Sequence, residues 1–173
     1  QNGFLSLHYI IVLNRTIVQR NGTWWEEGSR LEFWDQIFLF KRLYDQTMEP
    51  ITRRWGITRM ELDILLFLAN TPAYDTAADI VERRQLTKSH VSVSIQSLVR
   101  RGWLERTYRP GNRKSVHLRL LPPSAPAVAA GQSVQSALRA QLSQGMTAEE
   151  RAALESAFTR IGENLRLALK GDL

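Results

Sequence analysis

The chain has 173 residues, of which 43% are hydrophobic and 23% charged, and its net charge is +6 with no cysteine. Such a composition is ordinary for a folded domain that buries a core. The lack of cysteine excludes disulfides, thiolate metal sites and thiol redox switching, and it favours a reducing compartment.

The first element, residues 1–30, is expected to be an N-terminal extension for which no single structure is predicted. Its β-branched runs YIIVL and TIVQ, with the Asn21-Gly22 turn signal, are compatible with a hairpin. The most apolar stretch, FLSLHYIIVL, is too short to span a bilayer and lacks the basic start of a signal peptide. We therefore expect a cytoplasmic protein with no membrane partner.

Residues 31–56 are predicted to form a long helix. Pro50 should kink or restart it, and Gly56 should end it. The helix has too much apolar surface to pack on one side only, so it should meet a partner chain or a second helix. Its apolar residues recur at steps of three and four: Phe33, Ile37, Phe40, Tyr44, Met48, Ile51 and Trp55.

Two short helices follow, each opened by a threonine with an acid three residues later. Thr58 and Glu61 form the first capping box, and Thr76 and Asp79 form the second. The first helix should run to Asn70 and the second to Gln85. The side chains expected to face inward are Leu62, Leu65, Leu66 and Ala69 in the first helix, and Ala78 and Val81 in the second.

A third helix, opened by Thr87 and stopped by Gly102, has an unusual outward face. Its inward residues are predicted to be Val91, Ser94, Ile95 and Leu98. Serine is a mediocre helix former, so an outward face built of short polar groups suggests that something approaches the backbone closely. That face carries Lys88, Ser89, His90, Ser92 and Gln96.

The segments WLERTY and SVHLRL are predicted strands joined by the turn RPGNRK, which makes a hairpin with a cationic tip. In the second strand Val116, Leu118 and Leu120 alternate with polar residues and should face inward. His117, on the other face, is more often structural than functional in such a position. PPSAP then breaks the chain before two final helices, at about residues 125–143 and 147–170.

Charge is concentrated in one segment. Residues 83–119 contain ten basic residues against Glu105, a net +9, so the remainder of the chain sums to −3. Such polarisation is typical of a surface that binds a polyanion, although a merely solvated basic face is the alternative.

Three short helices followed by a hairpin predict a winged helix-turn-helix, in a mainly α protein with a small β-hairpin wing. The third helix of this fold usually enters the DNA major groove, the wing reaches phosphates or the minor groove, and capped helix N-termini can hold phosphates. The predicted DNA-binding residues are Thr76, Thr87, Lys88, Ser89, His90, Ser92, Gln96, Arg106, Arg109, Arg113 and Lys114.

The motifs GITRMELDILLFLAN, LTKSHVSVSIQSLVRRGWLER and GNRKSVHLRLL resemble the MarR family of bacterial winged helix-turn-helix transcription regulators. The resemblance implies a dimerisation helix at 31–56, a DNA-binding domain at 57–121 and dimerisation helices at 122–173. It also implies a homodimer on a pseudo-palindromic operator and a ligand-responsive repressor, with a small aromatic effector as a possible partner. Trp34, Phe38 and Tyr44 are candidate effector contacts, although such aromatics more often form core or dimer interface.

One departure from the family concerns the wing, where Asp-x-Arg is usual. Asn112 and Lys114 stand at the matching positions. Because Asn lacks the charge and Lys lacks the planar fork, the usual bidentate pair is not available. We therefore expect the wing contact to depend on Arg109 and Arg113.

Other function classes find less support in the sequence. No catalytic motif occurs, and His8, His90 and His117 have no metal-ligand spacing, so neither an enzyme nor a metal or other cofactor is expected. The alternative that remains is a winged-helix module that binds protein or RNA without operator recognition.

Overall fold

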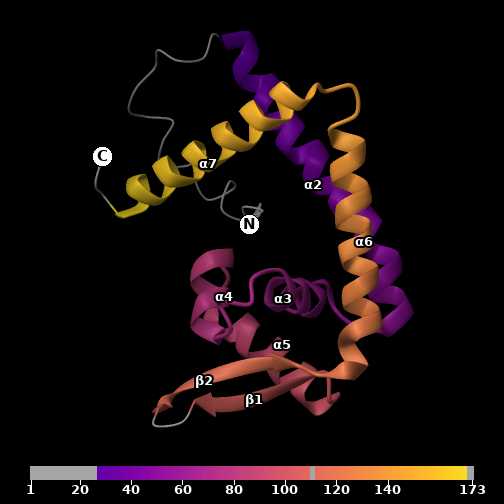
Figure 1. Cartoon of the computed structure of the whole chain (residues 1–173), viewed down its shortest axis with the longest axis vertical. Helices are drawn as coiled ribbons and strands as arrows, with labels where there is room; N and C mark the ends of the chain where they lie inside the picture. Colours follow the sequence, from indigo (N-terminus) through magenta and orange to yellow (C-terminus); the bar gives the residue numbers. More distant parts are fainter. Residues whose placement is uncertain (1–26, 110–111, 171–173) are drawn as a thin grey trace. The chain divides into compact units, whose positions relative to one another are not determined.

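The structure is a computed structural model that describes residues 27–109 and 112–170, with side chains described for residues 35–108 and 115–169. The possible hairpin of the first 26 residues lies outside this part. The chain forms two compact units, and the boundary between them follows Val134, within one helix. In chain order the elements are α2 (Glu27–Trp55), α3 (Arg59–Asn70), α4 (Ala77–Arg84), α5 (Lys88–Arg100), β1 (Leu104–Arg109), β2 (Asn112–Leu120), the 3₁₀ turn η1 (Pro122–Ser124), α6 (Ala125–Leu142) and α7 (Ala148–Lys170) (Figure 1).

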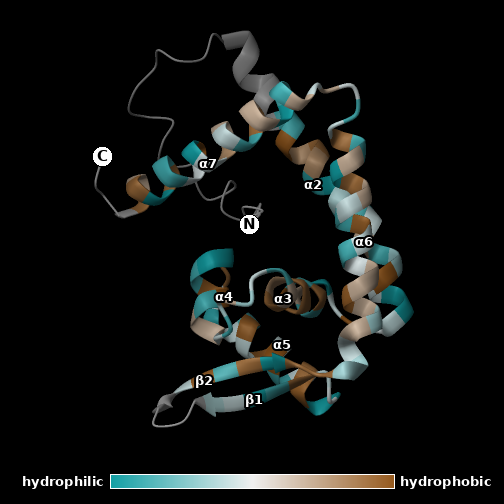
Figure 2. Cartoon of the chain, in the orientation of Figure 1, coloured by the Kyte–Doolittle hydropathy of each residue, from teal (hydrophilic) through white to brown (hydrophobic). Residues whose placement is uncertain are grey.

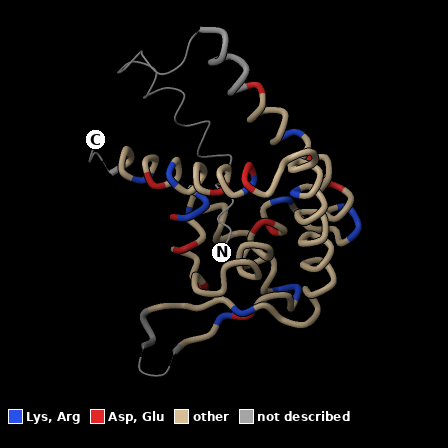
Figure 3. Tube along the Cα trace, turned by 45° about the horizontal axis from the view of Figure 1, so that its top comes forward, with Lys and Arg blue, Asp and Glu red and all other residues tan. Residues whose placement is uncertain are grey.

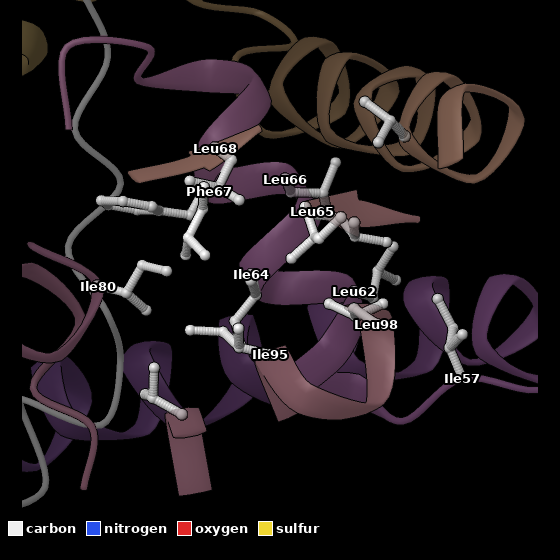
Figure 4. Close-up of a cluster of buried hydrophobic side chains, with 14 of the residues drawn as sticks. Ile57, Leu62, Ile64, Leu65, Leu66, Phe67, Leu68, Ile80, Ile95 and Leu98 are labelled. Carbon is white, nitrogen blue, oxygen red and sulfur yellow. The ribbon is translucent and has the colours of Figure 1, made fainter. Parts of the chain in front are cut away.

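The first unit is built around α3, the most hydrophobic of the short helices (Figure 2). Side chains from α3 meet Ile80 of α4 and Ile95 and Leu98 of α5 in one buried cluster (Figure 4). Removing any of these aliphatic groups is expected to cost about 2–5 kcal/mol. The buried α3 residues are Leu62, Ile64, Leu65, Leu66, Phe67 and Leu68.

Both predicted capping boxes are confirmed. The Thr58 hydroxyl accepts from the Glu61 amide at 3.1 Å, and the Glu61 carboxylate accepts from the Thr58 amide at 2.6 Å. Thr76 and Asp79 make the same reciprocal pair at the start of α4. Aspartate therefore serves here where glutamate or glutamine is usual.

The inward face of α4 was predicted correctly only in part, because Val81 packs against the core whereas Ala78 does not. Ala78 is exposed and Val81 is only partly buried, whereas Ile80 is completely buried. Ile80 lies two residues beyond Ala78 and therefore nearly on the opposite side of the helix. In a helix of only 8 residues, one large aliphatic side chain decides which face turns to the core.

Pro50 does not divide the long helix, since α2 continues through it as one element of 29 residues. Met48 and Ile51, on either side of the proline, are buried in the core of the first unit. Their packing offsets the hydrogen bond that the proline cannot donate.

The N-terminal turns of α6 complete the first unit beside α3. A Cβ atom added at Gly131 would lie 2.8 Å from Cδ2 of Leu66, which is closer than real side chains allow. Glycine at this position therefore permits α6 to approach α3. The Gln132 side-chain amide also donates to the Asn70 side-chain oxygen at 2.9 Å.

β1 and β2 form the predicted antiparallel hairpin, pairing Leu104 with Leu120 and Thr107 with His117. The predicted alternation in β2 is only partly correct. Leu118 is buried, but Val116 and Leu120 are partly exposed, and His117 on the other face is 8% exposed. The reason is that Thr76, just before α4, forms a β-bridge with His117 and brings the preceding turn over this strand.

Candidate nucleic-acid interface

Helix α5 presents an outward face made mainly of polar side chains. Val91, Ser94, Ile95 and Leu98 are buried as predicted, and they fix which side of the helix turns outward. The side chains predicted to meet DNA on this helix are all exposed: Lys88, Ser89, His90, Ser92 and Gln96. The helix and the hairpin lie next to each other at one end of the first unit (Figure 1).

The two threonines predicted to hold phosphates differ in how they are used. Thr76 is occupied by its capping box, since its hydroxyl also donates to the Asp79 carboxylate at 2.6 Å. Thr87 stands at the N-cap of α5 but makes no side-chain capping bond. Its hydroxyl lies 3.4 Å from that of Ser89, and both are exposed. Of the two helices, therefore, only α5 begins with backbone amides that no threonine side chain caps.

The cations of the basic segment, which are blue in Figure 3 where they are described, have different roles in the structure. Arg83 stacks on Tyr74, with its guanidinium carbon 3.2 Å from the ring centroid, and Arg119 pairs with Glu105 across the hairpin. Arg84 is partly buried over Phe67, and burial lowers its pKa from the ordinary value. Within the part of the chain that the structure describes, three exposed cations of the segment make no ion pair, hydrogen bond or ring contact: Lys88, Arg100 and Arg106.

Arg101 has a structural function that its neighbour Arg100 lacks. Its guanidinium donates to the backbone oxygen of Gly56 at 2.5 Å and to that of Trp55 at 3.3 Å. These carbonyls lie at the end of α2, where the helix leaves acceptors unsatisfied. Arg101 therefore fastens the C-terminal end of α5 to that of α2.

The base of the wing is held by a pair that sequence reasoning missed. His117 Nδ1 lies 2.6 Å from Asp75 Oδ1, and the Leu118 amide donates to the Asp75 backbone oxygen at 2.7 Å. These contacts confirm the structural reading of His117. Asp75 stands in the turn TPAYD, whose composition signals only a loop, so nothing in the sequence points to a partner 42 residues away.

The predicted wing residues are described only in part. Arg106 is exposed on β1. The backbone of Arg109 lies in β1 and that of Arg113 and Lys114 in β2, at the hairpin tip, but their side chains lie outside the described residues. The same holds for the side chain of Asn112.

An ionic cluster joins α2 to α3 in the first unit. Arg59 donates to Asp45 at 2.6 Å and to Asp63 at 3.0 Å, and its guanidinium lies 4.5 Å from the ring centroid of Tyr44. Burial raises the pKa of Asp63, against the attraction of Arg59. Burial also opposes the charge of Asp45, but a hydrogen bond from Lys41 and the charge of Arg59 together lower its pKa.

Phe38 and Tyr44, two of the three aromatic residues suggested as effector contacts, are not brought together. Tyr44 is partly buried against Arg59 and Phe40, whereas Phe38 is 50% exposed and lines a shallow hollow on α2 with Asp35, Leu39 and Arg42. The Trp34 side chain lies outside the described residues. The spacing of six residues places Phe38 and Tyr44 on different sides of the helix.

Glu61 is the buried acid nearest the start of α3. Burial opposes its charge, but hydrogen bonds from the Ser97 side chain and from Thr58 lower the pKa of Glu61 below its ordinary value of 4.5. Glu61 therefore links the capping box of α3 to α5.

Residues 27–109 and 112–170 contain neither a candidate metal site nor a candidate membrane span. No group of three or more His, Cys, Asp or Glu side chains in these ranges is placed to hold a metal ion. None of the helices in the same ranges is long and apolar enough to cross a membrane.

Comparison with known proteins gives a family match over part of the chain. Residues 55–115, from the end of α2 into β2, match the model of the MarR family. No curated protein sequence matches the chain.

Solved structures agree with this match over most of the chain. A MarR family transcription regulator shares 26% identity with a TM-score of 0.61, covering 81% of this chain and 95% of its own. A mutant of Escherichia coli MarR in complex with operator DNA shares 20% identity with a TM-score of 0.57, covering 77% and 95%. Staphylococcus aureus MarR in complex with salicylate and kanamycin also shares 20% identity, with a TM-score of 0.62, covering 80% and 93%.

These structural matches confirm the predicted fold, a mainly helical chain with a winged helix-turn-helix. The proteins in these similar structures are described as transcription regulators. The family match spans the core helices, α5 and most of the wing, which are the parts that build the exposed face described above. Over residues 55–115 the chain matches the MarR family, and the solved MarR family structure shares the fold of most of the chain.

Proposed function

We propose that this protein is a sequence-specific, DNA-binding transcription regulator that reads the major groove with α5 and contacts phosphates or the minor groove with its wing. The observation that carries the proposal is the exposed face of α5. It is free of acidic side chains, it is lined by short polar groups, and it is flanked by the unpaired cations Lys88, Arg100 and Arg106. A groove about 12 Å wide admits such a helix.

The relative crystallised with operator DNA supports this partner. DNA binding also accounts for the +9 charge of residues 83–119 better than a solvated face does, because only part of that charge is used within the fold. A regulator of genomic DNA in bacteria works in the cytoplasm, which agrees with the cysteine-free composition.

We propose that the protein acts as a homodimer on a pseudo-palindromic operator. Support comes from α7, which belongs to the second compact unit. Large apolar side chains at helical spacing are exposed on this helix of a single chain, and such a stripe normally requires cover. They include Leu154, Phe158, Ile161 and Leu169, with exposed fractions between 42% and 56%.

We propose further that the protein is a repressor released by a small molecule of the aromatic-acid class. The Staphylococcus aureus relative is described with salicylate bound, and this chain has no thiol with which to sense oxidants. Of the three aromatic candidates, Tyr44 is favoured, because it lies beside the cationic Arg59 at the junction of α2 and α3.

Salt dependence of binding tests the proposed function. A protein that contacts about six to ten phosphates loses roughly 10³ to 10⁵ in affinity between about 50 and 200 mM salt. We expect a loss of this size on duplex DNA, with weaker binding to A-form RNA. A nearly salt-independent interaction, or a preference for RNA competitor, would instead support the module that binds protein or RNA.

A further inference from the structure

Val93 lies exposed on the outward face of α5. Its exposed fraction of 64% is the highest among the exposed large hydrophobic side chains of the described residues. The residue was not among the predicted DNA contacts, because a valine within an alternating stretch such as VSVSI gives no sign of pointing outward.

Helix geometry places Val93 near the middle of the polar face. Each residue of an α-helix turns by about 100°. Ser89, Val93, Gln96 and Arg100, separated by four, three and four residues, therefore fall along one line. This line lies opposite the buried residues of the same helix, Val91, Ser94, Ile95 and Leu98.

Neither packing nor helix stability explains a valine here. Nearly two-thirds of its surface is open to solvent, so it contributes little to the core. Valine is also a poorer helix former than alanine, and it cannot bind a phosphate. A single exposed apolar side chain is common on protein surfaces. At this position, however, the proposed function places it against base edges, where the apolar group that the major groove offers is the C5 methyl of thymine.

We propose that Val93 reads a thymine through its C5 methyl group, beside the base read by Gln96. This inference rests on the proposed function. Because Gln96 lies one helical turn beyond Val93 and its amide can pair with adenine, the half-site should contain a thymine and an adenine within about one or two base steps of each other.

Replacement of thymine by uracil tests this contact, since uracil lacks only the methyl group. The operator is first recovered by selection of bound sequences from a random duplex pool, and each symmetric pair of thymines is then replaced by uracil. Burying one methyl-sized group is worth about fourfold in affinity. Wild-type protein should lose about fourfold per half-site at one thymine position.

Two variants complete the test. Val93→Ala should bind the thymine operator about as weakly as wild type binds the uracil operator, and should be indifferent to the uracil change at that position. Gln96→Ala is the matched control, because it changes the neighbouring contact and should keep the sensitivity to uracil. Alanine suits a helix and Val93 is exposed, so Val93→Ala should fold, which circular dichroism checks.

The possible failures are distinguishable. If selection recovers an operator but Val93→Ala retains full sensitivity to uracil, or no thymine position is sensitive in wild type, the thymine contact is wrong while the proposed function stands. If Val93→Ala weakens all duplexes equally, Val93 contacts the backbone and the inference is also overturned. If selection recovers no sequence, the proposed function and the inference both fall.

Discussion

His117 Nδ1 of β2 and Asp75 Oδ1 of the turn between α3 and α4 lie 2.6 Å apart, and they join the wing to the helical core. The His117 side chain is 11% exposed, so water cannot easily replace the carboxylate as its partner. The bond acts together with the amide of Leu118, which donates to the backbone oxygen of Asp75 at 2.7 Å. The orientation of the wing relative to α5 therefore depends on Asp75, a residue that lies outside both elements.

Replacing His117 by alanine should lower the free energy of unfolding by about 1–3 kcal/mol, because a buried hydrogen bond is lost and a carboxylate partner is left without its imidazole. Urea unfolding measures this change, and hydrogen exchange at the Leu118 amide should become faster. Ser115→Ala, on the same strand, is the control and should have a small effect. Equal losses for the two variants would show that the pair does not hold the wing.

Arg100 and Arg101 are adjacent, yet their alanine variants should have different defects, one in DNA binding and the other in stability. Arg101→Ala removes two hydrogen bonds to the end of α2 and should lower the free energy of unfolding by about 1 kcal/mol. Arg100→Ala should leave stability unchanged and weaken DNA binding, because Arg100 is exposed on α5 and makes no ion pair or hydrogen bond with the described residues. Urea unfolding and fluorescence anisotropy on both variants distinguish the roles. A reversed pattern would contradict this assignment.

The sequence predicted the elements with unequal success, and the difference has a physical cause. The capping boxes at Thr58 and Thr76 and the inward face of α5 depend on residues within one or two turns, so local rules find them. The continuation of α2 through Pro50 depends on tertiary burial of Met48 and Ile51, which no local rule contains.

The candidate site also has features that the sequence predicts and features that it does not. The exposed face of α5 follows from its buried face, so the exposure of Ser89, His90 and Gln96 was predictable. The partners of Arg101 and His117 were not, because they are 45 or 46 and 42 residues away along the chain. The exposure of Val93 was not predicted, because a hydrophobic residue is not expected on an outward face.

Glu61 should make stability depend on pH. The pKa of Glu61 is lowered in the folded state from 4.5, so its contribution is present above that value and is lost as the pH falls through the lowered pKa. Glu61→Gln keeps a capping side chain but removes the charge, and should be less stable than wild type by about 1 kcal/mol at neutral pH.

Urea unfolding at neutral pH and at successively lower pH checks this expectation. The difference between Glu61→Gln and wild type should shrink as the pH falls below 4.5. Glu82→Gln, which changes an exposed carboxylate on α4, is the control. A difference that stays constant with pH would mean that the charge of Glu61 contributes nothing.

Mutations should distinguish contacts to bases from contacts to phosphates. Gln96→Ala should relax the preference at one operator position by about 1–3 kcal/mol, whereas Arg113→Ala should weaken binding to all duplexes together and reduce the salt slope by about one. Binding titrations on operator and on random duplexes measure both effects. Equal losses on the two kinds of duplex for both variants would argue against base readout by α5.

The exposed apolar side chains of α7 should hold two copies together. Phe158→Asp combined with Ile161→Asp places charges in this stripe and should yield monomers that lose operator affinity. Ser156→Asp, at an exposed polar position of the same helix, is the control and should remain dimeric. Light scattering measures the molar mass of each variant in solution. A double variant that stays dimeric would place the interface elsewhere.

The most direct measurement of the central claim is selection of bound sequences from a random duplex pool with the full-length protein. If α5 from each of two copies reads a major groove, the selected sequences should converge on an inverted repeat whose half-site centres lie about one helical turn of DNA, or a multiple of it, apart. A pool that stays random after repeated rounds, or that converges on a motif without two-fold symmetry, would contradict the account.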